Sequence, residues 1–79
     1  KLQLTPNPAA SFFQMEFNGI DFENADYSVI NAEGKALLTG SFNKSNVQPI
    51  AVQHLASGNY FVQVILDKKT LLFDILHKQ

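Results

Sequence analysis

The chain has 79 residues, of which 46% are hydrophobic and 16% are charged, and its formal net charge at pH 7 is −1. This length suffices for one small domain, and the hydrophobic share argues against a disordered tail. The balanced charge and the absence of arginine argue against nucleic-acid binding, which needs a clustered basic face. The absence of cysteine excludes disulfides and thiolate metal sites.

The beginning of the chain carries neither an initiating methionine nor a signal peptide. We therefore expect residues 1–79 to form one β-sandwich domain that is a fragment of a larger secreted protein. The longest apolar runs are too short to cross a bilayer, so no transmembrane segment is expected.

Apolar and polar residues alternate along most of the chain, which predicts strands with one buried face. We expect seven strands, over residues 2–5, 11–17, 26–31, 35–42, 47–52, 59–66 and 70–77. In the second strand, Phe13 and Met15 share the buried phase. Between the strands, Asn18-Gly19 and the turn at 31–34 supply residues that tolerate positive φ.

The later strands differ in their expected positions within the sheets. Pro49 lacks an N–H donor, which places the strand over 47–52 at an edge or at a bulge. The strand over 59–66 is apolar on both phases except at Gln63, so we expect it to be central. The strand over 70–77 is ambiguous in phase, because apolar residues occur on both faces.

The strand spacing of about ten residues, without a helical period, predicts an all-β fold: an immunoglobulin-like antiparallel β-sandwich of about seven strands. The residues 52–55 have room for one short helical turn. We expect a core that includes Phe13, Met15, Leu55, Tyr60, Val62 and Val64.

Two short motifs mark the first half of the chain. Pro6-Asn7-Pro8 fixes φ twice in three residues, which makes a stiff corner suited to a chain that leaves one sheet for the other. On geometry alone, an ordinary rigid loop is the favoured interpretation. Gly34-Lys35 closes a hairpin in which Gly34 is expected to adopt positive φ. A phosphate-binding loop is not supported, because no glycine-rich stretch or following helix is present.

Two further motifs mark the second half. In the segment Leu55-Ala56-Ser57-Gly58-Asn59-Tyr60, we expect Leu55 to plug the core, Gly58 to permit the turn, and Tyr60 to send its hydroxyl back to nearby backbone as a tyrosine corner. The same pattern occurs in fibronectin-like modules. The chain then ends with an apolar strand followed by Lys78-Gln79.

In this order and spacing, the four motifs resemble the type A C-terminal sorting domain of the bacterial type IX secretion system, from about Leu2 to Gln79. The resemblance carries over the following motif residues: Pro6, Asn7, Pro8, Gly34, Lys35, Leu55, Gly58, Tyr60, Lys78 and Gln79. The chain departs from the family pattern at Thr5, where an aromatic or aliphatic residue is usual, at Asp74, where basic residues are common, and at His77.

The resemblance implies a non-catalytic sorting signal fused behind an N-terminal cargo domain. Its implied partners are the outer-membrane type IX translocon and a sortase-like peptidase, with cleavage and surface anchoring or release of the cargo. It implies a secreted or cell-surface protein that passes through the periplasm of a Gram-negative bacterium. Strand addition is a general way in which sheet edges bind, so the edge of the last strand is a candidate recognition surface.

A second interpretation stays open: a carbohydrate-binding or spacer module of a secreted enzyme or adhesin, with Phe12, Phe22 and Phe42 as candidate sugar-binding aromatics. An enzyme is not expected, because His54 and His77 lack partners and no nucleophile motif is present. No cofactor or metal site is expected either. The acidic residues between 21 and 26 lack the pattern of a calcium loop and are interpreted as a solvated turn.

Overall fold

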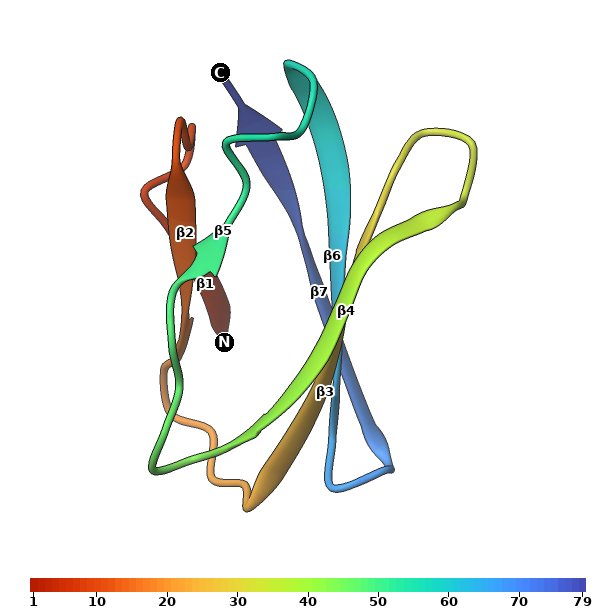
Figure 1. Cartoon of the computed structure of the whole chain (residues 1–79). Helices are drawn as coiled ribbons and strands as arrows, with labels where there is room; N and C mark the ends of the chain where they lie inside the picture. Colours follow the sequence, from red (N-terminus) through yellow and green to blue (C-terminus); the bar gives the residue numbers. More distant parts are fainter.

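Seven strands and no helix make up the computed structural model, which describes all 79 residues (Figure 1). The strands are β1 (Leu2–Thr5), β2 (Phe12–Phe17), β3 (Asn24–Ile30), β4 (Ala36–Asn43), β5 (Ile50–Ala51), β6 (Gly58–Leu66) and β7 (Thr70–Lys78). They form two antiparallel sheets, with strand orders β1-β2-β5 and β4-β3-β6-β7. The predicted all-β immunoglobulin-like sandwich is confirmed.

Six of the seven strands lie within two residues of their predicted bounds, whereas the fifth is much shorter than predicted. The prediction placed it over 47–52, but β5 contains only Ile50 and Ala51, which pair with Phe13 and Phe12 of β2. Pro49, directly before it, has no N–H to contribute to a ladder. Because β5 borders only β2, the predicted edge position is confirmed.

β6 and β7 form the longest strand pair of the four-stranded sheet. The central position predicted for the sixth strand is confirmed, since β6 lies between β3 and β7. Every second residue of β6 from Tyr60 to Leu66 is buried against the opposite sheet. In β7, Leu76 is fully buried and Leu72 is half-buried, so the structure decides the phase that the sequence left ambiguous.

The hydrophobic core unites both sheets and contains these fifteen buried residues: Leu2, Leu4, Ala9, Phe13, Met15, Phe22, Ala25, Val29, Ile50, Val52, Tyr60, Val62, Val64, Leu66 and Leu76. Five of the six predicted core residues are among them. The sixth, Leu55, is half-buried and packs against the cluster from its rim. The segment before it forms a single turn, closed by a hydrogen bond from the Leu55 N–H to the Val52 carbonyl.

One packing feature of the sheet was not predicted. Gly40 of β4 lies directly opposite Tyr27 of β3, and the Tyr27 ring covers the glycine. A Cβ atom added at Gly40 would lie 2.5 Å from the Tyr27 hydroxyl oxygen, closer than any unstrained contact. A side chain at Gly40 would therefore displace the Tyr27 ring, a constraint that no local sequence pattern reveals.

Candidate functional site

All four sequence motifs lie at one end of the sandwich, at the top in Figure 1. We call this region the motif end and define it as residues 6–9, 31–35, 55–60 and 77–79. The β6–β7 turn and the chain before β3 lie at the opposite end. Segments that are up to 70 residues apart in the chain contact one another there, as the hydrogen bond between Asn7 and His77 shows.

The first motif is tied to the last strand through the side chain of Asn7. Its Nδ2 donates to the Ile75 carbonyl at 2.8 Å, and its Oδ1 accepts from the His77 N–H at 2.8 Å. The carboxamide thus offers β7 one donor and one acceptor, as a residue of a neighbouring strand would. Both flanking prolines, Pro6 and Pro8, follow cis peptide bonds. The predicted passage from one sheet to the other is wrong for the strands, because β1 and β2 on either side of the motif pair within the same sheet and only Ala9 bridges to the other sheet.

Ala9 continues this contact in backbone form. Its N–H donates to the His77 carbonyl and its carbonyl accepts from the Gln79 N–H, both at 2.8 Å. These bonds make an isolated parallel bridge between Ala9 and Lys78. The fully buried methyl group of Ala9 leaves no room for a larger side chain at this seam between the sheets.

The third motif forms the tyrosine corner that was predicted. The Tyr60 ring is buried in the core, and its hydroxyl donates to the Ala56 carbonyl at 2.7 Å. Gly58 has φ of +142°, a conformation that side chains rarely adopt, and a Cβ atom there would meet no neighbour within 4 Å. Gly58 is therefore required by the backbone and not by packing.

The second motif closes the β3–β4 hairpin. Gly34 has φ of +87°, as expected, and the Asn31 side-chain oxygen accepts from the N–H groups of Glu33 and Lys35. A shallow pocket of about 420 Å³ connects this turn to the third motif and to β7, because Gly34, Tyr60 and Ile75 all line it. Lys35, which follows Gly34 in the same turn, is exposed to solvent.

The chain end is bonded to two of the other motifs. Lys78 pairs with Gly58 at the start of β6, and His77 Nδ1 lies 2.6 Å from the Asn59 side-chain oxygen. Lys78 is half-buried, and its ammonium group donates to the Gln79 carbonyl. Of the two departures in this strand, His77 is exposed at the motif end. Asp74 lies half-buried on the inward phase, where its carboxylate accepts from the Ile75 N–H.

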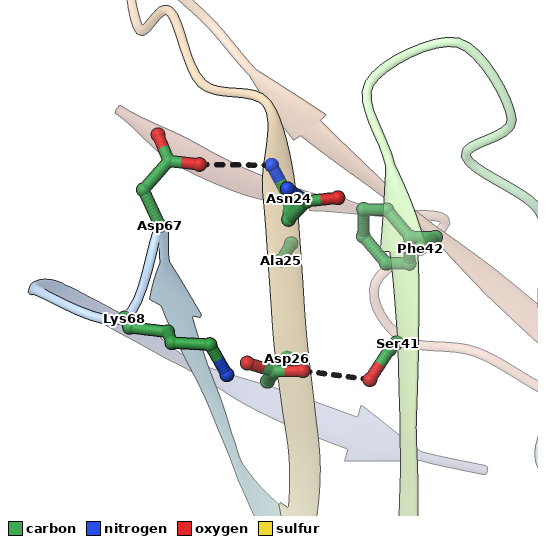
Figure 2. Close-up of a pocket in the computed structure, with 7 residues that line it drawn as sticks. All are labelled: Asn24, Ala25, Asp26, Ser41, Phe42, Asp67 and Lys68. Atoms are coloured by element: carbon green, nitrogen blue, oxygen red, sulfur yellow. Dashed lines mark hydrogen bonds between the residues drawn. The ribbon is translucent and has the colours of Figure 1, made fainter.

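The opposite end holds a polar pocket that the motifs do not reach (Figure 2). The Asp67 carboxylate accepts from the N–H groups of Glu23 and Asn24 and thereby ties the β6–β7 turn to the start of β3. Asp26 accepts from the Ser41 hydroxyl at 2.6 Å, and Lys68 points toward Asp26 in Figure 2. The Asp67 and Asp26 carboxylates thus both accept hydrogen bonds from other residues of the domain. These bonds explain the polar lining of the pocket as part of the turns that connect the strands.

The acidic loop before β3 pairs with a lysine. The Lys44 ammonium lies 3.0 Å from the Glu23 carboxylate and 4.0 Å from that of Asp21. The hydrogen bond with Glu23, followed by the charges of Glu23 and Asp21, raises the pKa of Lys44 above its ordinary value. The two acidic residues thus belong to an exposed ion-pair cluster, as in a solvated turn.

The remaining candidates do not converge on a site. His54 is exposed in the loop before β6, and His77 is exposed near the end of β7. No three histidine or carboxylate side chains are placed to hold one metal ion. The three candidate sugar-binding aromatics do not share a surface, since Phe22 is buried, Phe42 is half-buried and Phe12 is exposed on the other sheet.

Comparison with known families identifies the domain. The model of the secretion system C-terminal sorting domain matches residues 3–76, nearly the entire chain. The chain belongs to this family. No curated protein and no solved structure matches it.

Membership in this sorting-domain family confirms the resemblance to a type IX secretion signal. Proteins that carry such a tail are secreted or cell-surface proteins of Gram-negative bacteria, and the tail implies an N-terminal cargo that the secretion system handles. The family is one of sorting signals and not of enzymes. The fold includes no helix with the length and hydrophobicity that a membrane crossing requires.

Proposed function

We propose that this domain is a non-catalytic sorting signal that directs its cargo across the outer membrane, and that the motif end is the part the type IX translocon recognises. The observation that carries the proposal is the convergence of the four motifs: Asn7 binds β7, Gly58 pairs with Lys78, and Gly34 shares a pocket with Tyr60. A receptor that contacts this end meets all four segments at once.

The finer steps follow from the same role. The cargo passes the inner membrane by its own signal peptide, and the folded domain then meets the translocon from the periplasm. A sortase-like peptidase removes the domain, and the cargo is anchored at the surface or released. The ten motif residues act in this scheme as recognition and scaffold groups, with the exposed Lys35 and Gln79 at the surface that a receptor reaches.

The test is export of a fluorescent cargo fused in front of the domain in a bacterium with type IX secretion. The intact domain is expected to carry the cargo to the cell surface. Deletion of residues 71–79 is expected to retain it in the periplasm, but this also removes the buried Leu76 and unfolds the sheet. Lys78→Ala combined with deletion of Gln79 is the sharper change, since it leaves the core intact and removes only a half-buried side chain, an exposed residue and the Gln79 N–H bond to the Ala9 carbonyl.

A matched control lies at the opposite end of the molecule. Lys68→Ala with Lys69→Ala removes two positive charges from the β6–β7 turn, which the proposal leaves outside the recognised surface. Export that falls for the variant at Lys78 and Gln79 but not for this control supports the proposal, provided that both variants keep the wild-type melting temperature. Equal loss for both variants, or no export by the intact domain in several hosts, contradicts it.

A further inference from the structure

The outer edge of β7 is paired along only half of its length. In an antiparallel pair, residues alternate between those that bond to the partner strand and those whose N–H and carbonyl groups point away. The backbone of His77 bonds to Asn7 and Ala9, so His77 is one of the residues that point away from β6. By the same alternation, Ile75, Phe73 and Leu71 also direct their backbone groups to this outer edge.

The fate of these groups differs along the strand. Asn7 and Ala9 take up the groups of His77 and the Ile75 carbonyl, and the Asp74 carboxylate takes up the Ile75 N–H. No strand, side chain or loop bonds to the outward backbone groups of Leu71 and Phe73. The lower half of β7 in Figure 1 is therefore an open sheet edge, next to an upper half that is bonded to the Asn7 side chain and to the Ala9 backbone.

The space beside the open half is a cleft between the two sheets. It has a volume of about 390 Å³ and is lined by Lys1, Leu2, Leu71, Leu72, Phe73 and Asp74. Four of these residues are apolar, one is positively charged and one is negatively charged. The opposite wall is β1, the edge strand of the other sheet. The Asn18 N–H bonds to the Lys1 carbonyl, so Leu2, the next residue, directs its backbone groups away from β2.

The open edge carries less protection than edge strands usually have, because no lysine, proline or bulge lies between Leu71 and Phe73 and the only charge beside them is the inward-phase Asp74. Natural edges carry lysine, proline or a bulge where they would pair with another chain. Leu71 and Phe73 are instead 56% and 59% exposed, and no bulge interrupts the register of β7. The Phe73 ring stacks on Phe61 of β6 with 5.0 Å between ring centres, which extends the apolar surface onto the outer face of the sheet.

We propose that the Leu71–Phe73 edge binds an extended, apolar strand of a partner protein by β-strand addition. Backbone groups spaced two residues apart match the donors and acceptors of an extended backbone, so a strand pairs with both of these residues at once. Ala9 already pairs with the same edge through its backbone N–H and carbonyl. The partner strand places alternate apolar side chains over Leu2 and Leu72, and the others beside Phe73. The inference does not depend on the sorting role.

The first test measures amide hydrogen exchange by NMR with a defined probe. The probe is a capped eight-residue peptide of alternating valine and threonine, and its control is the same peptide N-methylated at every residue, which removes the N–H donors of both strand edges. The unmodified peptide is expected to slow exchange at Leu71 and Phe73 by about tenfold, which corresponds to one hydrogen bond of about 1.4 kcal/mol. The N-methylated peptide is expected to give no protection.

The second test uses paired variants of the protein. Phe73→Pro removes an N–H that bonds to nothing within the fold, and edge strands tolerate proline at such positions. Phe73→Thr keeps that N–H and removes the aromatic ring. Loss of peptide binding in Phe73→Pro, with binding in Phe73→Thr kept within about threefold, supports strand addition.

Three results would overturn the proposal. One is the absence of protection at Leu71 and Phe73 with millimolar peptide. The second is equal binding of both peptides with shifts confined to the Phe61 face, which would show an apolar surface contact without strand pairing. The third is protection without peptide that grows with protein concentration, which would show that a second copy of the chain occupies the edge.

Discussion

The two ends of this sandwich are held together in different ways. At the motif end, the Asn7 side chain bonds to the backbone of β7 across 68 and 70 residues, and the Tyr60 hydroxyl bonds locally to the loop before its own strand. At the opposite end, the two-residue turn at Asp67 and Lys68 is local, and Asp67 alone ties it to a distant segment. Short motifs that lie far apart in the sequence therefore make the contacts that close one end of the fold.

This difference predicts the largest loss of stability at Gly58. Gly58→Val is expected to lower the free energy of unfolding by about 1–3 kcal/mol, because φ of +142° is strained for any residue with a side chain. Ser57→Val, at the exposed neighbouring position, is the matched control and should change stability little. Chemical denaturation measures both. Equal stability of Gly58→Val and the wild type would show that the turn does not require glycine.

The next effect compares the two side chains that join distant segments at either end. Asn7→Ala removes two hydrogen bonds to β7 and is expected to cost about 1–2 kcal/mol, since a typical bond contributes about 1 kcal/mol. Asp67→Ala removes the bonds to Glu23 and Asn24 and is expected to cost a similar or smaller amount.

Hydrogen exchange distinguishes these two variants more sharply than their total stability. Asn7→Ala should speed exchange at the amide of His77 and leave that of Asn24 unchanged, and Asp67→Ala should do the reverse. Faster exchange at both ends in either variant would mean that the ends open together, and the contrast between them would fail.

The smallest effect is a gain in stability at the opposite end. Lys68 has φ of +61°, which glycine adopts without strain. Lys68→Gly is expected to raise the free energy of unfolding by up to about 1 kcal/mol, as the relief of strain outweighs the greater freedom of the unfolded chain. Thermal melting measures the gain. A lower melting temperature would show that the Lys68 side chain, which points toward Asp26, stabilises the turn.

Some features of the candidate site were open to prediction, and others were not. The tyrosine corner at Tyr60 and the positive φ of Gly34 depend on a few adjacent residues, so the local pattern sufficed. The bonds from Asn7 to Ile75 and His77 join opposite ends of the chain, and no signal in either segment names the other. The same holds for Tyr27 over Gly40, a contact made across the β3–β4 pair.

The sequence by itself determined the strands, their turns, the central position of β6 and the resemblance to a sorting domain. Each of these depends on alternation, on turn chemistry or on the order of motifs, which are properties of neighbouring residues. Only the tertiary structure decided the phase of β7, the short length of β5, the convergence of the four motifs, and the open edge at Leu71 and Phe73. These depend on which strands meet across the sandwich, and that is settled by long-range packing and backbone pairing.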